Sequence, residues 1–340
     1  MTDLPSDPAV DNQVEKLLSN AVVRESSDRG TSDGGSGVQH VKVSAAHSGQ
    51  RVDNFLMREL KGVPRTHVYR MIRRGDVRIN KKRCKPDRKL ILGDEVRVPP
   101  YSGANVQEPG ELSSTLKARL INLVLLETED YLVIDKPSGM AVHGGTGIRL
   151  GLIEAVRQVS TQWAQAELVH RLDRETSGCL LIAKNALFLK AAQDQFRAKT
   201  VSKEYFALVH GSWPSSVSTV NASLVKDALG DAERIVRVSD SGKPALTRFT
   251  VQQRFANATL VRAAPETGRT HQIRVHCQYT GHPIVGDDKY TAREIAPSLR
   301  RVTSLCLHAA KLTFDDPKKG KRIEVSAPIN KHFSLLLESL

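Results

Sequence analysis

The chain has 340 residues, an ordinary apolar content of 40% and a net charge of +13 at pH 7. No stretch approaches the roughly 18 apolar residues of a membrane span, and the N-terminus lacks the apolar centre of a signal peptide, so we expect neither a membrane nor a secreted protein. The 4 cysteines show neither paired metal-ligand spacing nor a disulfide framework, which suits a cytoplasmic protein.

Residues 1–39 are acidic and of low complexity. They carry 3 Lys and Arg against 7 Asp and Glu, and the stretch SSDRGTSDGGSG offers little to bury. Because such a composition cannot offset the entropy lost on folding, we predict a disordered tail.

Residues 40–100 are predicted to form a compact basic unit. QRVDNFLMREL and RTHVYRMIRRG place apolar side chains at helical spacing, and DVRIN and GDEVRVPP then alternate as short strands. The unit carries 16 Lys and Arg against 6 Asp and Glu, a pattern typical of proteins that bind polyanions. The cations expected to contact a phosphate backbone are Arg73, Arg74, Lys81, Lys82 and Arg83. A basic surface that is merely solvated is the alternative.

After a predicted linker at residues 101–120, residues 121–340 mix short strands with fewer helices. Strands are predicted at YLVIDKP, GCLLIAK, YFALVHG, ERIVRVS, TLVRAAP, LHAAKLTF and KRIEVSAP, and helices at ALFLKAAQDQFRAK and HQIRVHCQYTG. Because strands outnumber helices and the two kinds of element do not alternate strictly, we predict an α+β fold rather than a doubly wound sheet.

The stretch HRLDRETSG, residues 170–178, sets five ionisable side chains between apolar runs. Asp173 lies between Arg171 and Arg174, whose positive charges favour the ionised carboxylate. TSG is typical of a turn that leads into the strand GCLLIAK, which would hold Asp173 on a rigid support. A carboxylate in that place can act as a nucleophile or base, or form a structural ion pair; the stretch alone leaves both open.

Two further stretches place polar side chains within predicted apolar elements. Tyr205 begins the strand YFALVHG, where it either faces a cleft or belongs to the core. In TGRTHQIRVH, His271 and Arg274 share one helical face, so the guanidinium can reach a partner carboxylate. His271 and His276 lack a third ligand at suitable spacing, so we predict no metal site.

These stretches resemble the motifs of the pseudouridine synthases of the ribosomal large-subunit type. The resemblance rests on DYLVIDKPSGMAVHGG, HRLDRETSGCLLIAK, KEYFALVHG and GRTHQIRVHCQYTGHPIVGD. In the basic unit, RVDNFL, MIRRGDVRIN and GDEV are similar to the RNA-binding module typified by ribosomal protein S4. The resemblance covers roughly residues 40–335 and implies an S4-like α/β domain at 40–100 followed by a catalytic domain at 121–340. It implies that the catalytic domain has a mixed, mostly antiparallel sheet with a central cleft.

The resemblance implies an RNA pseudouridine synthase that isomerises specific uridines of 23S ribosomal RNA after flipping them out of the stack. It implies that Asp173 is the catalytic aspartate, that Arg274 pairs with it and that Tyr205 lies against the uracil ring. Arg171 is expected to fill the gap in the RNA stack, because a planar cation can stack on bases. Further RNA contacts are expected from His170, Arg269 and His271.

Breaking an N-glycosidic bond, rotating the uracil and rejoining it through carbon needs no metal and no redox cofactor, so we expect none. We also expect a monomer. Two alternatives stay open: a non-catalytic ribosome-assembly factor that grips RNA, and the same enzyme class acting on other ribosomal or transfer RNA uridines. A pure binding protein has no reason to combine Asp173, Tyr205 and Arg274, which favours the enzyme.

Overall fold

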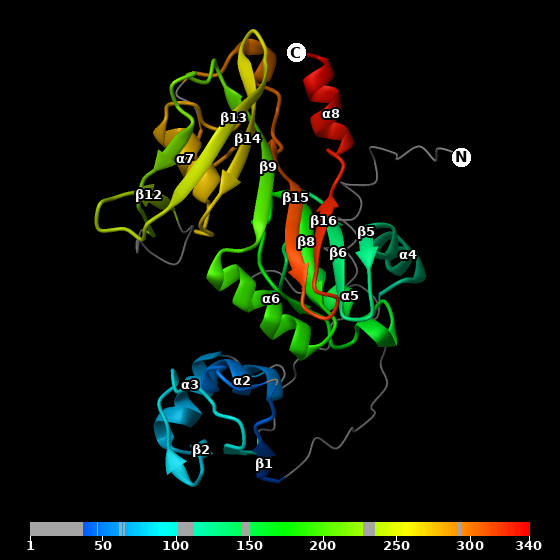
Figure 1. Cartoon of the computed structure of the whole chain (residues 1–340), viewed down its shortest axis with the longest axis vertical. Coiled ribbons are helices and arrows are strands. Elements are labelled where there is room, and N and C mark those ends of the chain that lie inside the picture. The colour runs from blue at the N-terminus through cyan, green and yellow to red at the C-terminus, as the bar shows by residue number, and fades with distance from the viewer. Residues whose placement is uncertain are drawn as a thin grey trace, which may run out of the picture. The chain divides into compact units, whose positions relative to one another are not determined.

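The computed structural model describes residues 37–340 except for 46, 61–62, 64, 101–111, 145–149, 227–234 and 292–293. These residues form two compact units, one within residues 37–100 and the other within residues 112–340 (Figure 1). The predicted tail lies almost entirely outside the described residues and stays a prediction. No helix in the described part of the chain is long and apolar enough to cross a membrane.

The N-terminal unit packs two helices against a four-stranded antiparallel sheet. The helices are α2 (Val52–Glu59) and α3 (Arg65–Arg74), and the strands run in the order β1 (Gln39–Lys42), β4 (Glu95–Val98), β2 (Arg78–Ile79) and β3 (Lys82–Arg83). Both predicted helices are confirmed, and their apolar faces bury Phe55 and Ile72 in one small core. Asn80 and Lys81 both have positive φ, which gives the tight turn that joins β2 to β3.

The C-terminal unit is built on one ten-stranded sheet, shown in green to red in Figure 1. Its main path runs through β10 (Thr219–Asn221), β13 (Leu246–Arg254), β14 (Ala258–Pro265), β9 (Ser202–His210), β15 (Leu307–Asp316), β8 (Ser177–Ala183), β6 (Tyr131–Lys136) and β5 (Val124–Glu127). In addition, β16 (Lys321–Ser326) pairs with β15 and β7 (Glu167–Leu168) pairs with β8. Among the described strands only β8 and β15 pair in parallel, so the predicted mixed, mostly antiparallel sheet is confirmed.

Two further strands and five α-helices accompany this sheet within the described residues. They are the ribbon β11 (Leu224–Lys226) with β12 (Val236–Val238), and the helices α4 (Ser114–Asn122), α5 (Leu152–Val156), α6 (Ala186–Ala198), α7 (Gln272–Tyr279) and α8 (Lys331–Glu338). The predicted helices at 186–199 and 271–281 are confirmed as α6 and α7. Helix α6 buries Phe188 beside Leu181 of β8, whereas α7 buries Ile273 beside Val261 of β14.

The linker predicted at residues 101–120 is wrong in its second half. Residues 114–122 form α4, and Ser113 caps it by accepting a hydrogen bond from the backbone N–H of Leu116 at 3.3 Å. Leu116 and Leu120 are buried against the sheet. Residues 101–111 lie outside the described residues, so the rest of the linker stays a prediction.

The loop that holds Asp173 leads directly into β8, whose first residues lie very close to β15. The first residues of β8 pair with β15, Ser177 with His308 and Gly178 with Ala309. Gly178 has a φ of +103°, and a Cβ there would lie 2.3 Å from the carbonyl oxygen of Ala309. Only glycine allows the two backbones to approach this closely. Gly178, the final residue of HRLDRETSG, therefore allows the end of this loop to lie directly against β15.

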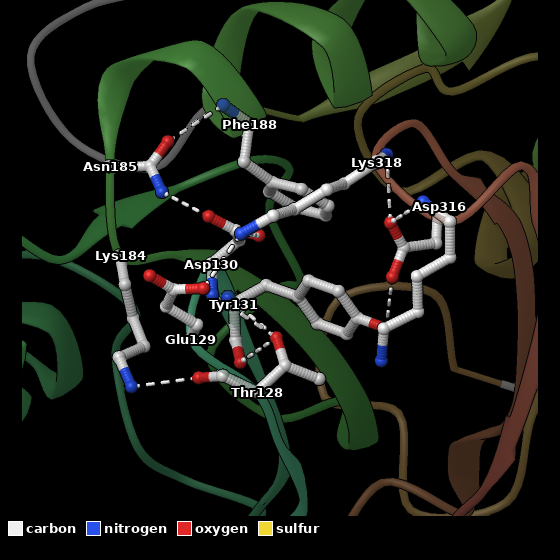
Figure 2. Close-up of polar contacts among 10 residues, drawn as sticks. Thr128, Glu129, Asp130, Tyr131, Lys184, Asn185, Phe188, Asp316 and Lys318 are labelled. Atoms are coloured by element: carbon white, nitrogen blue, oxygen red, sulfur yellow. Dashed lines mark hydrogen bonds and ion pairs between the residues drawn. The ribbon is translucent and has the colours of Figure 1, made fainter.

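The opposite end of β8 is anchored by a polar network (Figure 2). Asp130 accepts a hydrogen bond from the side chain of Asn185 at 2.8 Å and lies 3.6 Å from the ammonium of Lys318. Tyr131 donates to Asp316 at 3.3 Å, and Asp316 also accepts the backbone N–H of Lys318. These contacts join the start of β6 and the end of β8 to the β15–β16 hairpin, so the strand behind Asp173 is held at both ends.

Candidate active site

A cavity of about 430 Å³ brings together the polar residues predicted from three separate stretches. The loop between β7 and β8, strand β9, and the segment that leads into α7 all line it. The predicted residues on its wall are His170, Arg171, Asp173, Tyr205, Arg269, His271 and Arg274. The volume is in the range typical of small-ligand sites. A second cavity, of about 530 Å³ beside α8, contains none of them.

The carboxylate of Asp173 has no hydrogen bond or ion pair within the described residues. Its side chain is half-buried on the cavity wall. Arg174, which follows it, donates instead to the carbonyl of Gly139 at 2.8 Å. The structural ion pair that the sequence left open is therefore not formed, and the carboxylate is available to a bound molecule.

The backbone around Asp173 is held by the segment that follows β6. The buried ammonium of Lys136 donates to the carbonyl oxygens of Arg174 and Met140, both at 2.8 Å, and Ser138 donates to the carbonyl of Glu175 at 2.7 Å. Burial lowers the pKa of Lys136 to about 7, against the opposing effect of the nearby carboxylates of Glu175 and Asp173. Sequence reasoning gave Lys136 no role. The signal that could have indicated one is a lysine at the end of an otherwise apolar strand.

Tyr205 and Lys203 face the cavity from the same side of β9. Tyr205 packs between two core clusters while it lines the cavity, so both of its predicted environments are present. Burial raises the pKa of its phenol, and the charge of Asp173 raises that pKa further, so the phenol is neutral. Burial lowers the pKa of Lys203 to about 8. Sequence reasoning missed Lys203, which the two-residue period of a strand places beside Tyr205.

The expected pairing of Arg274 with Asp173 is not formed; Arg274 pairs with Asp287 instead. Its Nε and Nη2 donate to the two carboxylate oxygens of Asp287 at 2.7 and 2.6 Å. The two side chains are 3% and 0% exposed. Burial opposes the charged guanidinium, but the bond to Asp287 outweighs it and raises the pKa of Arg274, with a further contribution from Asp173. The turn after Ile284 folds back onto α7, which local sequence patterns do not reveal.

His170 is held inside the fold. Its Nε2 accepts a hydrogen bond from the backbone N–H of Leu181 at 3.0 Å, and its ring stacks on Phe196 with centroids 4.9 Å apart. Burial and the nearby charge of Lys203 lower the pKa of His170 to about 3. The neutral imidazole therefore ties the loop to β8, and its predicted contact with RNA stays a prediction.

The predicted RNA-binding arginines and lysines lie on the surface. Arg171 is exposed at the rim of the cavity, and Arg269 is exposed with its Nε on the carbonyl of Pro244. All five cations predicted to bind RNA in the N-terminal unit are exposed: Arg73, Arg74, Lys81, Lys82 and Arg83. A groove of about 550 Å³ in that unit is lined by two of them, Arg74 and Lys81, and by two that sequence reasoning left out, Arg78 and Arg97.

Two protein families match this chain. Residues 130–279 match the family described as RNA pseudouridylate synthase, and residues 50–96 match the S4 domain. The first match contains Asp173, Tyr205 and Arg274, and the second covers most of the N-terminal unit.

Curated relatives and solved structures agree with these matches. The chain is 49% identical over 308 residues to the ribosomal large subunit pseudouridine synthase C of Salmonella typhi and 48% identical to that of Escherichia coli K12, covering 89% of this chain and 97% of each relative. The structure of human RNA pseudouridylate synthase domain containing 4, at 24% identity, has a TM-score of 0.56 over 66% of this chain and 95% of that chain. Domain containing 1, at 28% identity, has a TM-score of 0.52 over 63% and 86%.

Proposed function

The chain belongs to the RNA pseudouridylate synthase family, and from that premise we propose that it isomerises specific uridines of large-subunit ribosomal RNA to pseudouridine. The observation that carries the proposal is the cavity in which Asp173 lies beside Tyr205, with no hydrogen bond or ion pair to its carboxylate from any described residue. The relatives named for this activity span nearly the whole chain, which supports the substrate class.

Asp173 is the proposed catalytic carboxylate. It is available to the reacting nucleoside because no described side chain binds it, and its backbone is held through Lys136 and Ser138. Arg274 is held by Asp287 on the same cavity wall, and the charge of Asp173 contributes to the raised pKa of its guanidinium. We therefore assign Arg274 to positioning and electrostatics rather than to a direct ion pair.

Tyr205 is proposed to pack against the uracil ring. Its phenol is neutral and sits on a rigid strand, so it presents an aromatic face to a flipped base. The reaction breaks the N1–C1′ bond, rotates the uracil and forms the C5–C1′ bond, with the C5 proton lost and N1 protonated. The rearrangement leaves the net charge of the base unchanged, and a neutral phenol beside the base is compatible with it.

The RNA is proposed to be gripped at two places. Arg171 at the cavity rim takes the place of the flipped nucleotide in the stack, because its exposed guanidinium forms no hydrogen bond or ion pair within the described residues. The cations of the S4-type unit bind the phosphate backbone and supply affinity. Ribosomal RNA as substrate places the activity in the cytoplasm, and we propose a monomer because one chain supplies the whole cavity wall.

The test is to map pseudouridines in ribosomal and transfer RNA from cells that lack the gene, complemented with the wild type or with Asp173→Asn. The amide keeps shape and hydrogen bonding without the charge. The wild type should restore specific sites in the large-subunit RNA, and Asp173→Asn should restore none while still binding RNA. Restored sites in the variant, or sites only in transfer RNA, would contradict the proposal.

A further inference from the structure

His271 has an unusual backbone on the cavity wall. It precedes the first residue of α7 with φ 53° and ψ 20°, in the left-handed region. Non-glycine residues seldom adopt this conformation, and it persists where the surrounding structure enforces it. The contact of the His271 side chain therefore shows which part of the structure holds this residue.

That contact is a hydrogen bond to Tyr290, a side chain only 1% exposed. The Oη of Tyr290 lies 2.8 Å from Nδ1 of His271 and accepts the backbone N–H of Val236 at 3.0 Å. A phenol has one proton to donate. Because Oη has no other acceptor among the described residues, its proton points to Nδ1 of His271. Burial raises the pKa of Tyr290, so the proton is kept at neutral pH.

Tyr290 is itself fixed by the buried ion pair. Its backbone N–H donates to Asp287 at 3.0 Å, and the guanidinium of Arg274 lies 5.2 Å from the centroid of its ring. The turn after Ile284 thus fixes Arg274 and Tyr290 together, and Tyr290 fixes the ring of His271.

His271 is neutral in this setting. Burial lowers its pKa; the charges of Asp173 and Asp287 oppose this effect, and those of Arg274 and Lys289 add to it. A neutral imidazole whose Nδ1 accepts a hydrogen bond carries its proton on Nε2. No partner for Nε2 is found in the part of the chain that the structure describes, although His271 lines the cavity.

We propose that Tyr290 holds His271 as the Nε2–H tautomer, so that His271 donates a hydrogen bond to a carbonyl oxygen of the target uracil. The inference rests on the proposed function and deepens it by assigning a base-recognition role to His271 and a positioning role to Tyr290. Uracil offers two carbonyl acceptors, O2 and O4, and cytosine replaces O4 by an amino group. A fixed N–H donor in the cavity suits uracil. This donor exists only when His271 is the Nε2–H tautomer.

Two substitutions of His271 separate the donor from the backbone. Asn tolerates the left-handed backbone, but its amide reaches only the position of Nδ1, whereas the longer Gln places an amide N–H near the position of Nε2. Single-turnover rates should therefore fall by roughly 2- to 13-fold in His271→Asn, the range for one hydrogen bond, and less in His271→Gln. Equal rates, or a slower Gln variant, would overturn the proposal.

Two readouts separate recognition from a merely structural role. RNAs with sulfur in place of O2 or of O4 of the target uridine carry a weaker acceptor at one position. The wild type should react more slowly with one of them, and His271→Asn should lose that difference. Nitrogen NMR of the imidazoles should show the Nε2–H tautomer of His271 in the wild type and a mixture in Tyr290→Phe, with Tyr279→Phe, at an exposed tyrosine on α7, as the matched control.

The outcomes distinguish the two proposals. If the wild type makes no pseudouridine, the proposed function fails, and the NMR experiment still tests the tautomer. If the wild type is active but His271→Asn keeps the same response to sulfur, base recognition by His271 is refuted. An unchanged tautomer in a folded Tyr290→Phe variant would refute the positioning role of Tyr290.

Discussion

Replacing Asp287 by Asn should destabilise the C-terminal unit far more than replacing Asp173 by Asn. Asp287 and Arg274 form two hydrogen bonds of 2.6 and 2.7 Å between fully buried groups. Removing one charge of such a pair costs about 3–5 kcal/mol, because the remaining charge is buried without compensation. Asp173 has no bonded partner within the described residues, so its replacement should change the free energy of unfolding by about 0.5 kcal/mol or less.

Thermal unfolding of the full chain, followed by tryptophan fluorescence, measures this difference. Trp163 and Trp213 are the 2 tryptophans of the sequence, and both are buried in the C-terminal unit, so the signal reports that unit alone. For a unit of this size, 1 kcal/mol shifts Tm by roughly 2–4 °C, so Asp287→Asn should lower Tm by about 6–20 °C and Asp173→Asn by about 2 °C or less.

A double variant supplies the control. Adding Arg274→Met to Asp287→Asn removes the orphaned charge and should recover part of the lost stability. If Asp173→Asn lowers Tm as much as Asp287→Asn does, then Arg274 is paired with Asp173 and the assignment drawn from the geometry is refuted.

Three other predictions concern RNA binding and pH. Arg171→Ala should slow modification strongly on a structured stem-loop and weakly on an unstructured RNA, with Arg171→Lys restoring only part of the rate; equal losses on both RNAs would remove its role in flipping. Neutralising surface cations of the N-terminal unit should reduce the log–log salt slope of RNA binding by roughly 0.7–0.9 for each phosphate that the protein no longer neutralises, and an unchanged slope would mean a merely solvated surface. The cations to replace are Arg73, Arg74, Lys81, Lys82 and Arg83. Folded His170 stays neutral down to about pH 3, whereas the unfolded chain binds a proton there below about pH 6.5. As the pH falls between those values, the free energy of unfolding of the wild type should therefore decrease by up to about 1.4 kcal/mol per pH unit relative to that of His170→Gln. The Gln side chain can still accept the hydrogen bond from the backbone N–H of Leu181. Parallel curves of unfolding free energy against pH for the two proteins would contradict this.

Local sequence determined most of the elements and the place of the central carboxylate. The helices α2, α3, α6 and α7 follow from apolar side chains at helical spacing, and the short strands follow from alternation, because both periods are set by backbone geometry. Asp173 could be placed on a loop entering β8 because the turn and the apolar run adjoin it in the chain. The motifs indicated the family, and the comparisons confirm it.

Tertiary structure alone decided which side chains meet. Arg274 pairs with Asp287 rather than Asp173, and His271 meets Tyr290, because the segment after α7 folds back onto the helix. Helix α4 escaped prediction since its apolar face is recognisable only once the sheet that buries Leu116 exists. Hydrogen bonds and ion pairs depend on separations of about 3 Å in space, and chain order does not set those separations.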